Sequence, residues 1–162
     1  MKKQDIELKK YLEVTSNFIK NSIRNDFKYN SVYDFLLVHG KNYQIKAFPE
    51  DLEDWKGVKG YCWHNAGSMV LEVNHLTYCE GYALAESLPI PLPHSWAIDP
   101  EENVVDPTWN NGISYFGVPF NLDYVMFTML ERGYYASVID FWEKGFQLLK
   151  GNHVYLDGKV TT

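Results

Sequence analysis

The fold is decided by residues 60–109, in which four short motifs follow one another along the chain. They read Gly60-Tyr61-Cys62, Glu80-Gly81-Tyr82-Ala83, His94-Ser95-Trp96 and Asp106-Pro107-Thr108-Trp109. A thiol, an imidazole and a carboxylate therefore occur in that order, with strand and turn signals between them. We expect the rest of the chain to act mainly as the scaffold that packs this segment.

The first motif opens a helix. Ala66, Met69, Val70 and Val73 follow Cys62 at helical spacing and form one apolar stripe with it. The pattern predicts a helix that begins at Cys62 and turns the thiol toward the sheet that follows. Free amide groups and the helix dipole at such a position favour a thiolate and leave hydrogen-bond donors for an oxyanion.

The later motifs predict strands. Residues 78–85 alternate as one strand, and residues 94–98 and 104–106 form a hairpin turned by residues 99–103. If the turn pairs residue 98 with residue 104, His94 and Asp106 share a face and lie diagonally opposite, within side-chain reach. Asp99 falls on the opposite face and at the turn, so Asp106 is the preferred partner of His94.

The remaining elements are predicted from apolar periodicity and capping residues. Residues 5–27, which include Phe18, predict a helix with one buried face, and Ser31 caps a short helix that stops at Gly40. Loops are expected at residues 41–60 and 110–119. We expect two further helices at residues 122–130 and 138–149, closed by Gly133 and Gly151, and a short edge strand at residues 153–156.

Length and composition indicate one globular domain over residues 1–162, because 46% of the residues are hydrophobic and 22% are charged. The net charge of −6, with scattered Lys and Arg residues, argues against a nucleic-acid partner. No apolar run reaches the ~20 residues that span a bilayer, and the start of the chain lacks a signal-peptide pattern. We therefore expect a cytoplasmic protein with reduced cysteines, although a Cys62–Cys79 disulfide is allowed by parity.

Together, the four motifs resemble the transglutaminase-like core of the papain-like cysteine enzymes, over about a third of the chain. In that superfamily a Cys opens a helix and precedes a Gly-Tyr strand, a His-x-Trp strand and an Asp-Pro-Thr turn. The resemblance implies an α+β, papain-like (transglutaminase-core) fold, with the nucleophile helix packed on a small antiparallel sheet. Cys62 matches the family nucleophile, His94 its imidazole and Asp106 its carboxylate, while Gly81-Tyr82 and Trp96 match framework positions.

These matches predict cysteine-dependent acyl transfer, with hydrolysis favoured by the small size of the chain. The substrate would be a peptide, a protein or a small amide or ester, and no cofactor is expected. Related cores act as crosslinking enzymes, peptidases, amidases or deamidases, and some have lost activity. The side-chain donor of the oxyanion hole is not identified by the pattern; the candidates for it and for substrate contact are Trp55, Gln44, Asn42, Trp96 and Trp109.

Two other interpretations remain open. A catalytically silent module could keep the same core and bind a peptide or a protein in the cleft. A zinc site could use side chains from Cys62, His64, His75, Cys79 and His94. The spacing argues against zinc, because the chain has no Cys-x-x-Cys or His-Glu-x-x-His pair and residues 62 and 64 point to different helix faces. The oligomeric state is not predicted.

Overall fold

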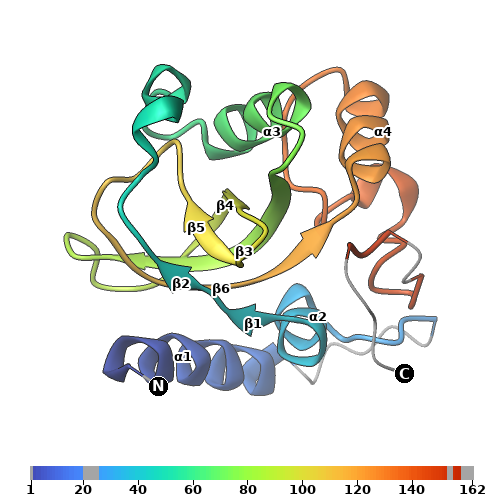
Figure 1. The fold of residues 1–162 in the computed structure, drawn as a ribbon. Helices are drawn as coiled ribbons and strands as arrows, with labels where there is room; N and C mark the ends of the chain where they lie inside the picture. Colours follow the sequence, from blue (N-terminus) through green and yellow to red (C-terminus); the bar gives the residue numbers. More distant parts are fainter. Residues whose placement is uncertain (1, 20–25, 153–154, 158–162) are drawn as a thin grey trace.

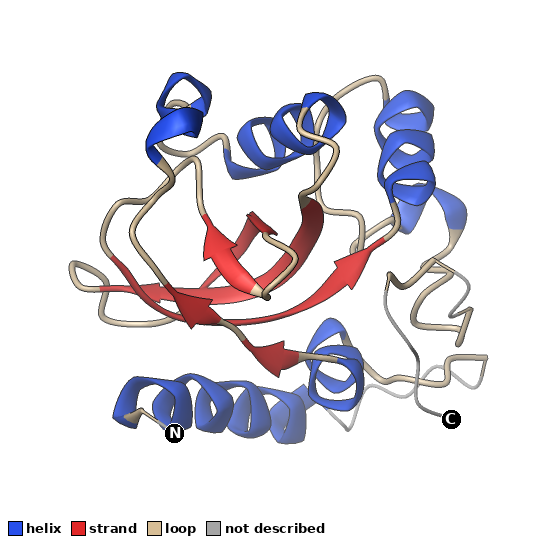
Figure 2. Ribbon diagram, in the orientation of Figure 1, coloured by secondary structure: helices blue, strands red, loops and turns tan. Residues whose placement is uncertain are grey.

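A computed structural model describes residues 2–19, 26–152 and 155–157. The helices are α1 (Lys3–Ile19), α2 (Val32–His39), α3 (Cys62–Glu72) and α4 (Leu122–Arg132), with short 3-10 helices η1 (Glu50–Trp55) and η2 (Trp142–Lys144). The strands are β1 (Lys41–Asn42), β2 (Gln44–Ile45), β3 (Thr77–Ala85), β4 (Leu92–Ile98), β5 (Asn103–Val105) and β6 (Gly112–Phe120). The α+β class is therefore confirmed (Figure 2).

One sheet organises the molecule. Its six strands are ordered β1-β6-β3-β4-β5-β2, and every pair is antiparallel except β2 with β5. Helices α3 and α4 lie above the sheet and α1 and α2 lie below it (Figure 1). None of the helices in the described ranges is long and apolar enough to cross a membrane.

The sheet curls until its two edges nearly meet. The edge strands β1 and β2 are separated in sequence only by Tyr43, whose amide donates to the Tyr115 carbonyl at 3.1 Å. The segment 41–45 therefore pairs with β6 on one side and with β5 on the other, which brings the ends of the sheet together. The result is a small, nearly closed barrel.

Residues alternate between the inside and the outside of this barrel. The inner cluster contains Tyr43, Cys79, Ala83, Trp96, Ile98, Val104 and Tyr115. The outer face packs on the helices: Ala66, Met69 and Val70 of α3 belong to one large core with Ala97 and Val105. Helix α3 therefore covers the outer face, and its first turn lies at the end of the barrel.

Two paired glycines allow the strands to approach closely. Gly81 of β3 lies opposite Gly117 of β6. A Cβ at Gly81 would lie 2.5 Å from the Cα of Gly117, and a Cβ at Gly117 would lie 2.6 Å from the Trp96 ring. Both positions thus lack side chains because backbone and the central tryptophan occupy the space.

Several predicted elements are confirmed. The helix begins at Cys62, and the hairpin pairs residue 98 with residue 104. Ser31 caps α2 by accepting a hydrogen bond from the Asp34 amide at 3.2 Å. Gly133 ends α4 in the left-handed conformation with φ 72°.

Other expectations are wrong. Residues 110–119 are not a loop, because β6 runs through them between β1 and β3, and residues 41–60 contain β1, β2 and η1. Residues 138–149 do not form one helix but turns around η2, because the backbone enters the left-handed region at Gly145 with φ 71° and at Phe146 with φ 56°.

The ends of the chain differ from the prediction as well. Residues 26 and 27 lie outside α1, whose buried stripe is Leu8, Leu12 and Ser16, so Phe18 is exposed. The predicted continuation through residues 20–25 and the start of the edge strand at residues 153–154 lie outside the described residues. Leu156 does form an isolated antiparallel bridge with Phe120.

We predict that Gly81→Ala lowers the free energy of unfolding by about 3 kcal/mol, because the new methyl group would overlap backbone that cannot move aside. Urea denaturation followed by circular dichroism measures this loss. The matched control is Gly133→Ala, where φ is 72° but no atom lies within 4 Å of the new methyl group. It should cost only about 1 kcal/mol, from backbone strain alone. Equal losses in the two variants would contradict the close-approach explanation.

Candidate active site

The structure brings together the three side chains that the sequence singled out. Cys62 is the first residue of α3, His94 lies in β4, and Asp106 directly follows β5. The His94 Nε2 atom lies 2.8 Å from Asp106 Oδ2, and the Cys62 side chain lies near enough to the same ring to raise its pKa. Their exposed fractions are 7% for Cys62, 1% for His94 and 6% for Asp106. The imidazole therefore lies between the thiol and the carboxylate.

This order gives the two ring nitrogens different partners. With Nε2 directed at Asp106, Nδ1 is the nitrogen left for the thiol. His94 pairs with Gly81 and therefore belongs to the inner face of the barrel, whereas the apolar stripe of α3 packs on the outer face. Because Cys62 is the first residue of α3, the thiol meets His94 at the end of the barrel.

Four donors hold the Asp106 carboxylate. Oδ1 accepts the amides of Thr108 at 2.8 Å and Trp109 at 3.1 Å, which is the turn that an Asp-Pro-Thr sequence favours. Oδ2 accepts the Tyr115 hydroxyl at 2.7 Å in addition to His94. The charge is buried but fully hydrogen-bonded, which is the condition under which a buried carboxylate is tolerated.

The electrostatic surroundings favour a charged imidazole. Burial lowers the pKa of His94, but the hydrogen bond and charge of Asp106, followed by the interaction with Cys62, outweigh it and raise the pKa from 6.5 to about 9. At neutral pH the ring therefore carries a proton. A protonated imidazole beside a thiol is the arrangement that stabilises a thiolate.

Two tryptophans fix the plane of the imidazole. The Trp109 ring stacks on His94 with centroids 3.8 Å apart and 16° between the planes. Trp96 lies nearly parallel at 6.3 Å. Trp109 is half-buried and covers the ring, as expected for a wall of the site. Trp96 is completely buried in the barrel interior, so its predicted role in contacting substrate is wrong.

Asn65 ties the nucleophile helix to the Asp106 turn. Its Nδ2 atom donates to the Val58 carbonyl at 2.9 Å and to the Thr108 hydroxyl at 3.0 Å. A third connection runs from the Gly57 amide to the Pro107 carbonyl at 2.8 Å. Sequence patterns do not reveal this role of Asn65, because Thr108 is distant in the chain.

The three candidates for an oxyanion side chain lie in different elements of the fold. Gln44 is exposed in the edge strand β2, opposite Asn103. Trp55 ends η1 and packs against the large core, while Asn42 donates to the Tyr115 carbonyl at 3.4 Å. The helix itself offers donors, because Tyr61 at the N-cap makes no side-chain hydrogen bond to the first turn.

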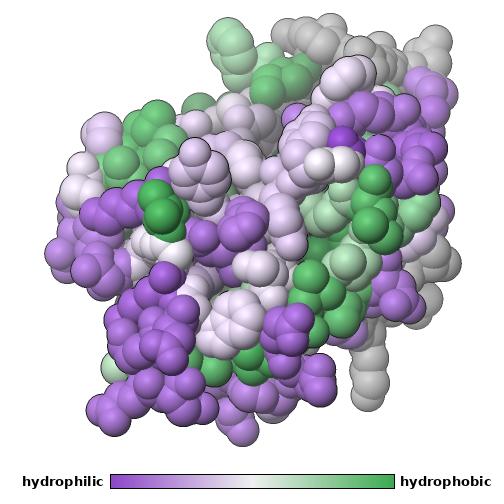
Figure 3. All heavy atoms as spheres, turned by 90° about the horizontal axis from the view of Figure 1, so that it is seen from above, coloured by the Kyte–Doolittle hydropathy of each residue, from purple (hydrophilic) through white to green (hydrophobic). Residues whose placement is uncertain are grey.

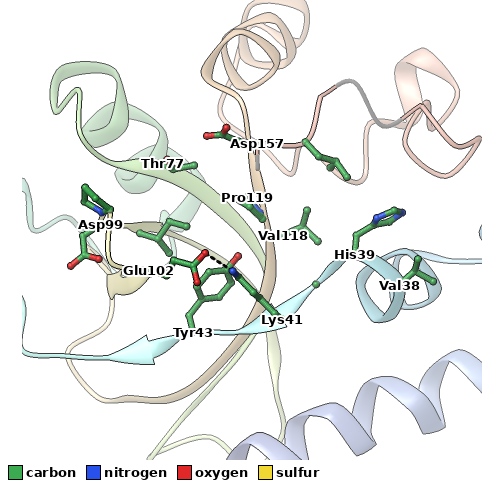
Figure 4. A pocket seen from close by; sticks show the side chains of 14 residues that line it. Val38, His39, Lys41, Tyr43, Thr77, Asp99, Glu102, Val118, Pro119 and Asp157 are labelled. Carbon is green, nitrogen blue, oxygen red and sulfur yellow. Dashed lines mark hydrogen bonds and ion pairs between the residues drawn. The ribbon is translucent and has the colours of Figure 1, made fainter. Parts of the chain in front are cut away.

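The carboxylate end of the site borders a cavity of about 590 Å³. Its wall includes Phe48, Lys56, Asp106, Trp109 and Tyr115. A larger cavity of about 700 Å³ lies at the other end of the barrel, beside the β4–β5 turn, and is lined by charged and polar residues such as His39, Asp99 and Asp157 (Figure 4). Lys41 and Glu102 form an ion pair there, and no member of the triad lines it.

The structure can also be compared with two alternatives from the sequence, a zinc site and a Cys62–Cys79 disulfide. Within the described part of the chain, no three His, Cys, Asp or Glu side chains are grouped so that they could hold a metal ion, and the five residues considered for zinc do not form such a group. Cys62 and Cys79 are both free thiols. Cys79 lies inside the barrel, where burial raises the pKa of its thiol.

Comparisons with protein-family models, with curated proteins and with solved structures find no match to this chain.

Replacing Asn65 should loosen the turn that holds Asp106. We expect Asn65→Ala to reduce the free energy of unfolding by about 1–3 kcal/mol, because the buried Thr108 hydroxyl and the Val58 carbonyl lose their donor. Chemical denaturation measures the effect. The matched control is Asn111→Ala, whose amide donates to Ser87 in an exposed hydrogen bond, and we expect a change within about 0.5 kcal/mol. A loss of that small size in Asn65→Ala would contradict the assigned role.

The raised pKa of His94 predicts a pH-dependent stability. The folded state holds a proton that the unfolded chain releases near its ordinary pKa of 6.5, whereas the folded pKa is about 9. This stabilisation is therefore complete below pH 6.5 and is lost as the pH rises through 9. Urea unfolding across this range should show a decline that His94→Gln lacks. Parallel profiles for the two proteins would contradict the assignment.

Proposed function

We propose that this protein is a cysteine hydrolase of the transglutaminase-like, papain-like type, which cleaves an amide or ester through a thioacyl intermediate. The observation that carries the proposal is the buried group of Cys62, His94 and Asp106. The thiol lies at a helix N-terminus, and the imidazole and the carboxylate form a hydrogen bond of 2.8 Å. A nucleophile, a base and an orienting carboxylate are the parts that acyl transfer requires.

The proposed reaction has two steps. The Cys62 thiolate attacks the carbonyl carbon, and His94 gives its proton to the departing amine or alcohol as the C–N or C–O bond breaks. Water then attacks the thioacyl carbon, His94 takes one proton from it, and the thiolate leaves with the acid as product. The backbone N–H of Cys62 stabilises the oxyanion in both steps. An amine in place of water would make the same chemistry a transfer reaction.

The fold and the surface support this proposal. A helix that opens with the thiol packs on a curled, mainly antiparallel sheet. The imidazole comes from β4 and the carboxylate from the residue directly after β5, an order like that of the superfamily that the motifs resemble. Val58 and Tyr61, just before the thiol, are 69% and 63% exposed and offer an apolar contact for a substrate. Seen from above, the surface carries both hydrophilic and apolar patches (Figure 3).

A second function is favoured by one observation. Cys62 is only 7% exposed, so a carbonyl group has little direct access to the sulfur. This favours a silent module that keeps the core and binds a peptide or protein at the same place.

We also propose a reducing, cytoplasmic compartment, which agrees with two free cysteines.

Thiol reactivity separates the two functions. In a Cys79→Ser background, which leaves Cys62 as the single cysteine, we expect iodoacetamide to alkylate Cys62 near neutral pH about tenfold faster than in the same background with His94→Ala. A nitrophenyl ester should give a burst of nitrophenol that Cys62→Ser abolishes. Equal alkylation rates together with no burst would favour the silent module.

A further inference from the structure

Tyr115 contacts the same carboxylate oxygen as His94. It lies in β6, is 2% exposed, and donates its hydroxyl to Asp106 Oδ2 at 2.7 Å, while His94 Nε2 lies 2.8 Å from that atom. Oδ1 of Asp106 is already occupied by two backbone amides. Both oxygens therefore have two donors each, and the carboxylate cannot rotate about its Cβ–Cγ bond without losing several hydrogen bonds.

A glycine leaves room for this hydroxyl. A Cβ at Gly112 would lie 2.5 Å from the Cζ atom of Tyr115 and closer still to the hydroxyl oxygen. The ring is fixed as well, since it packs edge-on against Trp96 with centroids 5.1 Å apart. The position of the hydroxyl is thus determined by backbone on one side and by the barrel interior on the other.

The hydroxyl is a permanent donor. Burial, followed by the charge of Asp106, raises the pKa of Tyr115 far above its ordinary value, so the group keeps its proton over the whole working range. Tyr115 and Asp106 also both line the cavity of about 590 Å³.

We propose that Tyr115 is a positioning residue of the active site, which holds the Asp106 carboxylate in place and shares its Oδ2 charge with His94. The inference rests on the proposed hydrolase function. Because Tyr115 takes part of the hydrogen-bonding capacity of Oδ2, the imidazolium is stabilised less than by an unshared carboxylate and gives up its proton to the leaving group more readily. Tyr115 keeps its own proton throughout, so no atom is transferred to or from it.

The test is Tyr115→Phe, which keeps the ring and removes only the hydroxyl. By NMR titration, we expect the pKa of His94 to rise from about 9 by about one unit, and the upper limit of the pH profile of Cys62 alkylation to move with it. For ester hydrolysis, we expect kcat to fall about tenfold with KM unchanged. An unchanged or lowered His94 pKa with unchanged kcat would overturn the proposal.

The matched control is Tyr43→Phe, because Tyr43 is also a buried tyrosine of the barrel interior, and its hydroxyl makes no hydrogen bond to Asp106 or His94. It should leave the His94 titration unchanged. If Tyr115→Phe fails to fold, Gly112→Ala displaces the same hydroxyl and should raise the His94 pKa in the same direction; no rise would count against the proposal.

The two proposals fail in different ways. Slow alkylation of Cys62 in the unmodified protein would reject the hydrolase function, and the His94 titration in Tyr115→Phe would still decide the role of Tyr115. Fast alkylation with an identical pH profile in Tyr115→Phe would reject the positioning role alone.

Discussion

The buried charge of Asp106 is the constraint on which the surrounding structure depends. A carboxylate removed from water must be compensated by hydrogen bonds. Its donors come from β4 through His94, from β6 through Tyr115 and from the amides of residues 108 and 109. Thr108 in turn accepts from Asn65 on α3. Satisfying one charge therefore fixes two strands, a turn and a helix relative to one another.

A second buried carboxylate acts on the outer face of the same sheet. Glu80 accepts hydrogen bonds from Tyr78, Ser137 and the Val138 amide, so it attaches the segment after α4 to β3. Burial raises the pKa of Glu80 despite these bonds. The neighbours of Glu80 hold a segment of chain in place, whereas those of Asp106 include a group that can exchange a proton. The two buried carboxylates, Glu80 and Asp106, thus have different roles in the structure.

Local patterns in the sequence were enough for part of this structure. The helix at Cys62 and the hairpin register depend on residues near each other in the chain, and they place His94 beside Asp106. Strand β6 was not predicted, because glycines usually indicate turns. In the structure, Gly112 and Gly117 instead leave space for the side chains of Tyr115 and Trp96. Because this segment was predicted as a loop, Tyr115 was not recognised as a neighbour of Asp106. The contact of Gly117 with Trp96 joins two separate strands, and no short window of sequence contains both partners.

The way the sheet closes has a consequence for its behaviour in concentrated solution. Unpaired edge strands are the usual template on which β-sheet proteins join into aggregates. Here both edges, β1 and β2, are two residues long and are joined through Tyr43. A second chain would find almost no length of free backbone along which to add a strand.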